Sequence, residues 1–269
     1  MPRINAVSFH EDSSIESICS RVLAAGFDAL EVSRPPFYYK LTTTGTRRTF
    51  ANWAADQGLG LYGFDCWVDV LPYTHPRETL DGFRAAVEFA RDMKLGMVIS
   101  HDPWAKDNGD HGPQECLDVN VSLFQQVADL CGEADLSLVF EPHPDTFSMD
   151  DDWCLQFIDG IDRKNVGVLY DCCHYGVGQP ETYVAAIGKL GHRIRHLHFS
   201  DGDLKTYALH LPLGEGDIQL DQVKAELKAI RFSGTLTCDM YNYPLLEDGA
   251  RRNAEPIRQV ESELGITRA

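Results

Sequence analysis

The sequence predicts an α/β fold in one domain that spans residues 1–269. Short β-rich runs alternate with longer stretches of helical period, and this βα alternation repeats eight times, with about 30 residues in each unit. No Pro-, Gly- or Ser-rich linker divides the chain, and its 43% hydrophobic content is enough for one large core. Eight βα units are the number that closes a parallel sheet into a (β/α)8 TIM barrel.

The predicted strands are short β-rich runs. Each run is bounded on both sides by turn residues or by a helical stretch. They span residues 4–9, 28–32, 60–64, 96–100, 137–141, 166–170, 195–200 and 235–240. An open, doubly wound sheet is the rival arrangement, and it would require a glycine-rich phosphate turn after the first strand. The sequence there, SFHEDSS, is not such a turn, so we expect the barrel.

Helical periodicity fills the segments between these strands. The predicted helices span residues 14–26, 47–58, 77–94, 113–134, 149–160, 180–191 and 220–230, followed by a last helix that ends near residue 264. Pro76, Pro113 and Pro180 stand where a first helical turn tolerates a missing N–H, and Gly26 and Gly58 follow helix ends.

Two further details concern single helices. The aspartates of residues 150–152 place negative charge at a helix start, where the helix dipole favours it. Pro256 lies inside the last helix and predicts a kink or a break there.

Polar residues follow the predicted strands at their carboxyl ends, which form the functional face of a βα barrel. They are His10, Arg34, Asp65, His101, Glu141, His143, Asp171, His174, His196, His198, Asp201 and Asp239. Together with His210, in the long loop after the seventh strand, seven of the ten histidines fall at this face. We therefore expect the chemistry of the protein at this end of the barrel.

Four of these residues, one from each of four successive strands, form a candidate metal site: Glu141, Asp171, His198 and Asp239. Three carboxylates and one imidazole are hard, oxygen-rich ligands that favour Mn²⁺, with Mg²⁺, Co²⁺, Zn²⁺ and Fe²⁺ as alternatives. A divalent ion would offset the desolvation of Asp171, which follows a wholly apolar strand. The alternatives for single residues are a helix cap or turn at Asp171 and Asp239, and a core histidine at His196.

Several motifs together resemble the sugar phosphate isomerase/epimerase family of xylose isomerase-like TIM barrels. They are VFEPHPDTF (139–147), VGVLYDCCHYG (166–176), IRHLHFSDGD (194–203) and LHLPLGEGDI (209–218), with further echoes in GFDALEVS (26–33) and FSGTLTCDMY (232–241). The resemblance covers most of the chain in the order typical of the family. It implies one divalent metal ion on Glu141, Asp171, His198 and the strand-eight carboxylate, with His174 contacting the substrate. Asp239 stands where the sugar epimerases generally have Glu.

The resemblance implies an isomerase or epimerase of a sugar, sugar phosphate or related polyol or keto compound. Such an enzyme removes a proton next to a metal-polarised carbonyl and passes through an enediolate. The catalytic candidates are Glu141, Asp239 and His174, and the substrate-binding candidates are His101, His143, His210, Arg34 and Lys205. Phosphate recognition has little support, because Arg34 and Lys205 are the only basic residues expected near this face.

Two alternatives remain at this point. The first is a metal-dependent lyase, similar to inosose or dehydroshikimate dehydratases or to enzymes that eliminate an aglycone from a sugar; the shorter Asp239 and the surplus histidines favour it slightly. The second is a non-catalytic barrel that binds a sugar or a partner subunit. The mass of the product distinguishes the first alternative, and metal analysis distinguishes the second.

The net charge of −17 argues against a nucleic-acid partner, because such binding uses clustered Lys and Arg. The same superfamily includes an endonuclease of abasic DNA, but Ala208 stands where the nuclease pattern has Asp. No run of residues resembles a signal peptide or a membrane span, so we expect a cytoplasmic protein without a membrane partner. Related barrels often form homo-oligomers, and no interface signal here selects an oligomeric state.

Overall fold

The computed structural model of the protein describes residues 2–9 and 14–266, and in these residues eight strands form one sheet in the order β1 to β8. The strands are β1 Arg3–Asn5, β2 Ala29–Ser33, β3 Gly60–Asp65, β4 Met97–Ser100, β5 Ser137–Phe140, β6 Val166–Asp171, β7 Ile194–His198 and β8 Thr235–Thr237. Every adjacent pair is parallel. The sheet closes where the Asn5 N–H donates to the Cys238 carbonyl (2.9 Å) and the Cys238 N–H donates to the Arg3 carbonyl (2.8 Å). The predicted (β/α)8 barrel is confirmed.

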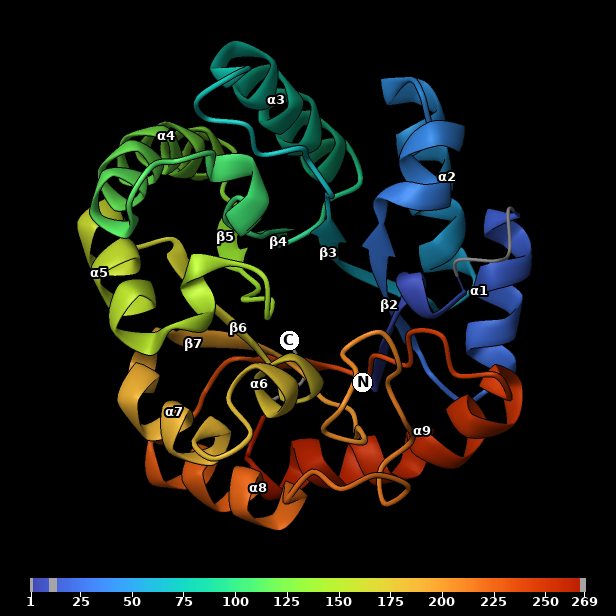
Figure 1. Ribbon diagram of the computed structural model, residues 1–269. Helices are drawn as coiled ribbons and strands as arrows, with labels where there is room; N and C mark the ends of the chain where they lie inside the picture. The colour runs from blue at the N-terminus through green and yellow to red at the C-terminus, as the bar shows by residue number, and fades with distance from the viewer. Residues whose placement is uncertain (1, 10–13, 267–269) are drawn as a thin grey trace.

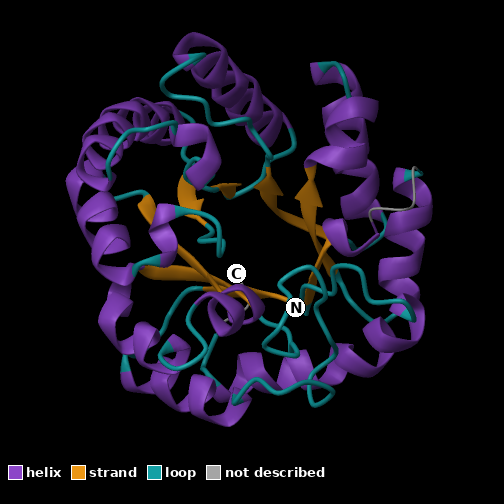
Figure 2. Cartoon of the chain, viewed as in Figure 1, coloured by secondary structure: helices purple, strands orange, loops and turns teal. Residues whose placement is uncertain are grey.

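Helices surround the barrel, as Figures 1 and 2 show. They are α1 Ile15–Ala24, α2 Thr44–Asp56, α3 Pro76–Asp92, α4 Pro113–Glu133, α5 Asp151–Ile161, α6 Cys172–Gly178, α7 Tyr183–Leu190, α8 Leu220–Ala229 and α9 Leu246–Glu263. Seven-residue α6 was not expected from the sequence and follows β6 directly. In the part of the chain that the structure describes, every helix is too short or too polar to span a bilayer.

Local signals set most helix ends. Pro76 and Pro113 are the first residues of α3 and α4, whereas α7 begins three residues after Pro180. Gly26 and Gly58 follow α1 and α2 with φ angles of +90° and +75°, a region that only glycine enters without strain.

Two aspartates act as helix caps. The Asp150 carboxylate accepts a hydrogen bond from the Trp153 N–H (2.9 Å) at the start of α5, as its position predicts. The Asp171 carboxylate accepts one from the His174 N–H (2.8 Å) at the start of α6. A kink or a break was expected at Pro256; helix α9 runs through this residue, so the break is wrong and the kink stays a prediction. The apolar residues Ala250, Ala254 and Ile257 of α9 pack into the core and hold the helix in place.

The interior of the barrel has two unlike halves. On the side of β4, β5 and β6, an apolar cluster fills the space, formed by Met97, Ile99, Val139 and Leu169. On the side of β2, β7 and β8, the interior is polar, with Glu31, His196, His198, Thr235 and Thr237 in mutual contact. This polar half lies next to the carboxyl ends of the strands, where the candidate site is found.

Candidate metal centre at the mouth of the barrel

The four predicted metal ligands come from four successive strands. Glu141 directly follows β5, Asp171 ends β6, His198 ends β7, and Asp239 lies two residues after β8. Because the strands are parallel, their carboxyl ends meet at one end of the barrel, and the four side chains are brought together there. All four are buried, with at most 7% of their surface exposed.

The side chains converge on one nitrogen atom. His198 Nδ1 lies 2.8 Å from Glu141 Oε1, 3.5 Å from Asp171 Oδ2 and 3.6 Å from Asp239 Oδ2. Oxygen atoms of three carboxylates therefore surround a single imidazole nitrogen inside the protein. In the absence of a cation, this crowding of acceptors is unfavourable.

Three buried atoms at this point make no hydrogen bond of good geometry among the described residues: His198 Nδ1, Asp171 Oδ2 and His174 Nδ1. His198 Nδ1 is close to Glu141 Oε1, but the contact lacks hydrogen-bond geometry. The other oxygen of Asp171 caps α6, which leaves Oδ2 directed at the centre of the cluster. Buried polar atoms are nearly always paired, so two unpaired atoms facing each other mark a place for a ligand. The donor set fits a divalent ion with a preference for oxygen and imidazole ligands.

The pKa shifts of these residues indicate that the site favours a positive charge. Burial lowers the pKa of His198, but the charges of Glu141 and Glu31 outweigh burial and hold this pKa well above its usual value. Burial raises the pKa of Glu141, yet the His198 charge outweighs it and brings the pKa to about 2. Burial raises the pKa of Asp239. Without an ion, a proton on His198 thus offsets the carboxylate charge.

A second layer of contacts holds His198 from behind. His198 Nε2 lies 2.8 Å from Glu31 Oε1, and the same carboxylate contacts His196 Nε2 at 2.7 Å and the Thr237 hydroxyl at 3.0 Å. His196 was expected to be a core histidine. Its Nδ1 atom also contacts the Thr235 hydroxyl at 2.7 Å. Glu31 was not among the predicted site residues. It could have been found as the charged residue in the middle of the apolar strand DALEV, because a strand of a parallel sheet is buried on both faces.

Four more histidines predicted from the sequence lie around the centre. The His143 ring is 4.2 Å from that of His174 and 5.9 Å from that of His101, and the His210 ring is 5.4 Å from that of His174. His174 Nδ1 lies 3.7 Å from Glu141 Oε1, and His210 Nδ1 lies 3.7 Å from Asp239 Oδ2. Burial lowers the pKa of His143 to about 3, so this imidazole is neutral.

These groups open into a cavity of about 260 Å³ at the barrel mouth, which we call the mouth cavity. Its lining consists of Asn5, Val7, Asp65, Trp67, Ser100, His101, Trp104, Glu141, His143, His174, Tyr207, Ala208, His210, Asp239 and Tyr241. The described lining contains four large aromatic side chains and no Lys or Arg. Its walls suit the apolar faces and hydroxyl groups of a small uncharged molecule.

The structure does not bring two of the predicted substrate-binding residues into the mouth cavity. Arg34 donates to the Trp67 carbonyl (2.6 Å) and lies over the Tyr38 ring, facing a separate surface pocket. Lys205 is exposed on the loop after β7. His10, which the sequence places at the end of the first strand, lies outside the described residues.

Asp65 was expected at the functional face, and Trp67 as a residue that lines an apolar pocket, but the contact between them was not predicted. The Trp67 Nε1–H donates to Asp65 Oδ2 (2.6 Å), and the indole lines the mouth cavity while 50% of the residue is exposed. Trp67 has a φ of +43°, which is unusual for a bulky residue. Backbone strain of this kind clusters at functional sites. No periodicity or motif in the sequence predicts it.

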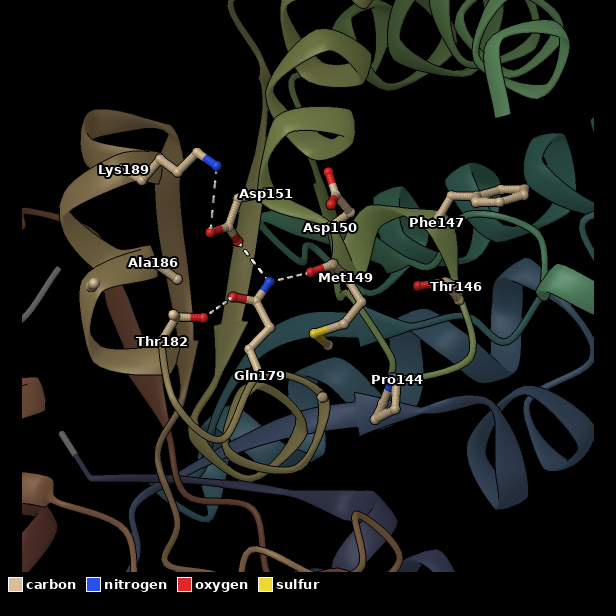
Figure 3. Close-up of a pocket in the computed structure, with 12 residues that line it drawn as sticks. Pro144, Thr146, Phe147, Met149, Asp150, Asp151, Gln179, Thr182, Ala186 and Lys189 are labelled. Atoms are coloured by element: carbon tan, nitrogen blue, oxygen red, sulfur yellow. Dashed lines mark hydrogen bonds and ion pairs between the residues drawn. The ribbon is translucent and has the colours of Figure 1, made fainter. Parts of the chain in front are cut away.

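A larger cavity of about 650 Å³ lies on the outer surface between the start of α5 and α7, and we call it the outer crevice. Figure 3 shows Gln179 at its centre. The Gln179 amide donates to the Met149 carbonyl and to Asp151 Oδ1 (2.9 Å), and its oxygen accepts from the Thr182 hydroxyl (3.0 Å). Lys189 pairs with Asp152 at 2.8 Å. These polar groups satisfy one another, and none of them comes from a strand end.

Comparison with known proteins places the fold among described relatives. A family profile described as xylose isomerase-like TIM barrel matches residues 19–260. An uncharacterized protein of Methanocaldococcus jannaschii, MJ1311, is 25% identical over 168 residues. That match covers 61% of this chain and 57% of the relative, so the chain spans little more than half of the length of this relative.

Solved structures share the fold over nearly the whole chain. A D-tagatose 3-epimerase-like protein has a TM-score of 0.80 at 20% identity, covering 98% of this chain and 97% of its own. The IOLI protein, solved with a zinc atom bound, has a TM-score of 0.82 at 16% identity, with 97% and 98% covered. The probable 3-DHS dehydratase AsbF of Bacillus anthracis has a TM-score of 0.77 at 16% identity, with 96% and 98% covered.

Proposed function

Because the chain belongs to the xylose isomerase-like TIM barrel family, we propose that it is a divalent-metal-dependent isomerase or epimerase of an uncharged sugar or related polyol ketone. One observation carries this proposal. Glu141 and Asp239 both line the mouth cavity, and both lie beside His198 Nδ1, the atom on which the candidate ligands converge. Acid–base groups and the candidate metal centre thus face the same small space.

The four candidate ligands have different roles in the proposed reaction. A divalent ion on Glu141, Asp171, His198 and Asp239 would polarise a substrate carbonyl and acidify the neighbouring C–H bond. Glu141, as a carboxylate, is the base that takes this proton. Asp239 is the second carboxyl group: in its protonated form, which its raised pKa favours, it gives a proton to the enediolate, and exchange with water then returns Glu141 and Asp239 to their starting forms.

The remaining cavity residues orient the substrate. His174, His101 and His210 present ring atoms to the cavity and can bind substrate hydroxyl groups. The His143 Nδ1 atom lies 2.9 Å from the Glu141 carbonyl, which leaves its other nitrogen for the substrate. Trp67 and Trp104 supply apolar faces against which sugar rings or chains can stack.

The charge of the cavity narrows the substrate class. Phosphate and carboxylate groups are bound in proteins by Arg, Lys or clusters of backbone N–H groups. The described lining residues include no Lys or Arg, and Arg34 and Lys205 lie elsewhere. This supports an uncharged ketose or cyclic polyol ketone over a sugar phosphate or a keto acid. The D-tagatose 3-epimerase-like structure is consistent with such a substrate at the level of the fold.

A test of the proposed function uses the Mn²⁺-loaded protein in D₂O with a panel of neutral ketoses and cyclic polyol ketones. We expect NMR to detect solvent deuterium at the carbon next to the carbonyl, and mass spectrometry to find no other change in mass. The Glu141→Gln variant is the control for exchange catalysed by free metal. Absence of exchange with every compound, in a protein that holds its metal, would contradict the proposal.

A metal-dependent lyase is the second candidate function, and the excess of imidazoles supports it. His174 lies beside Glu141, so an imidazole that can protonate a leaving group is present on the same side as the base. Among dehydratase substrates, a neutral inosose fits the described lining better than the carboxylate of dehydroshikimate. In the same experiment, elimination is recognised by a product that has lost the mass of water or of an aglycone.

A further inference from the structure

We propose that Glu31 is a positioning residue of the metal centre: its carboxylate fixes the His198 ring so that Nδ1, and not Nε2, is the ligand atom. This inference rests on the metal centre of the proposed function. The segment GFDALEVS contains Glu31 but gave it no role, and Glu31 does not line the mouth cavity. It acts on the centre through His198 from the polar half of the barrel interior.

The Glu31 carboxylate accepts hydrogen bonds from three side chains. Glu31 lies in the middle of β2 and is fully buried, and it reaches across the interior to residues of β7 and β8. Its two oxygens accept hydrogen bonds from His198 Nε2 (2.8 Å), His196 Nε2 (2.7 Å) and the Thr237 hydroxyl (3.0 Å). An ionised carboxylate has acceptors only, so both ring nitrogens must carry a hydrogen atom and donate it.

This arrangement decides which atom of His198 faces the ligands. With Nε2–H committed to Glu31, only Nδ1 is left for an ion, and it is the atom that the three other candidate ligands surround. The ring cannot turn over without losing the hydrogen bond to a buried charge. Metal-binding histidines commonly donate their second ring nitrogen to a carboxylate in this way.

The surrounding residues make room for this carboxylate. Gly63 of β3 faces Glu31, and a Cβ atom at that position would lie 3.1 Å from Met97 Cγ, 3.3 Å from Ile99 Cδ1 and 3.4 Å from Glu31 Cγ. The polar chain continues from Glu31 through His196 to the Thr235 hydroxyl, which anchors the second imidazole. The interior is therefore built to hold a charged side chain of this length.

Stability alone does not account for the buried charge. The opposite half of the interior is filled by Met97, Ile99, Val139 and Leu169, so apolar residues can fill a barrel of this size. Replacing a buried ionic cluster by apolar residues is often neutral or stabilising. The polar cluster occupies only the half beneath His198, which indicates that it serves the ligand.

The experiment compares Mn²⁺ binding to three full-length proteins by isothermal titration calorimetry: the wild type, Glu31→Gln and Thr237→Val. We expect Glu31→Gln to bind Mn²⁺ on the order of 10–100-fold more weakly, because a neutral amide cannot accept from both imidazoles. Thr237→Val is the matched control, since it removes one hydrogen bond to the carboxylate and keeps its charge and both imidazole contacts. It should stay within about threefold of the wild type.

A second measurement starts from the wild type, which tests the ligand atom of His198 directly. In ¹⁵N-histidine-labelled wild type loaded with diamagnetic Zn²⁺, we expect the His198 ring to bind through Nδ1 and to keep a slowly exchanging Nε2–H resonance. In Glu31→Gln this resonance should shift and exchange faster, while the His143 and His174 resonances stay in place. A purely structural role of Glu31 would lower stability without changing the ring atom that binds the ion.

Two results would overturn the proposal, and a third would contradict the proposed function. Coordination of the ion through His198 Nε2 in the wild type would overturn it, even if Glu31→Gln fails to fold. A folded Glu31→Gln protein that binds Mn²⁺ within about threefold of the wild type would do the same. A wild type that binds neither ion would contradict the proposed function instead, and the Nε2–H resonances of the metal-free protein would still test the contacts of Glu31.

Discussion

The mouth cavity and the outer crevice differ in a way that identifies the functional one. The outer crevice is the larger, at about 650 Å³ against about 260 Å³. Its polar side chains pair with one another, as Figure 3 shows around Gln179. At the mouth, in contrast, His198 Nδ1 and Asp171 Oδ2 are buried, face each other and make no hydrogen bond of good geometry among the described residues. Unsatisfied buried atoms, and not volume, indicate where a ligand belongs.

The two cavities also differ in how their charges are balanced. In the outer crevice, the Lys189 ammonium group offsets Asp152 at the surface, where solvent screens both charges. At the mouth, three buried carboxylates surround one imidazole. Four predictions test this contrast, from the largest expected effect to the smallest.

The largest effect is expected from Glu141→Gln. Loss of the base should lower turnover on the order of 10²–10⁴-fold, because an amide cannot accept the substrate proton. Turnover of the Mn²⁺-loaded protein and its circular dichroism spectrum measure activity and fold separately. Near-normal turnover in this variant would remove Glu141 from the mechanism.

Metal removal should have the next largest effect. We expect one divalent ion per chain by elemental analysis, and a loss of about 2.7 kcal/mol of stability on chelation when the ion is present at 100 times its Kd. Differential scanning calorimetry should then find Tm lower by several degrees. An unchanged Tm in chelator would argue for a barrel that holds no ion.

The affinity for Mn²⁺ should rise with pH. The pKa of His198 is held well above its usual value in the ion-free protein, so the ion must displace a proton from Nδ1. Below that pKa, each unit of pH should therefore increase the affinity about tenfold for each proton released. Titration calorimetry in two buffers with different ionisation enthalpies counts the protons. A pH-independent affinity would contradict the displacement.

The smallest effect is expected in the outer crevice. Lys189→Met removes an ion pair with the largely exposed Asp152 and a longer contact of 3.9 Å with Asp151, which keeps its hydrogen bond from Gln179. The free energy of unfolding should therefore change by less than about 1 kcal/mol. Turnover should equal that of the wild type, measured on the same substrate as for Glu141→Gln. A large loss of turnover would show that the two cavities are coupled and would break the comparison.

Most of the fold could be predicted from the sequence, because parallel strands buried on both faces are continuous apolar runs and the helices between them are periodic. Helix α6 was missed because seven residues are too few to show a period. The break expected at Pro256 was wrong, because packing of α9 on the core outweighs the lost hydrogen bond. Tertiary contacts, which the sequence does not display, decided both cases.

The candidate site could be predicted in part. Residues at strand ends, such as Glu141 and His198, are found by counting along each strand, since parallel strands bring their ends together. Glu31 shows locally only as a charge within an apolar strand, and its contacts with distant strands are not visible in the sequence. The unusual backbone angle of Trp67 leaves no local pattern. Arg34 and Lys205 lie at the predicted face in sequence, but the paths of their loops direct them away from the cavity.

Asp171 takes part in two structures with one side chain: Oδ1 holds the first turn of α6 through the His174 N–H, and Oδ2 faces the candidate metal centre. A small rotation of the carboxylate moves both oxygens together. The α6 N-terminus, which carries His174, and the candidate metal centre are therefore connected through a single carboxylate.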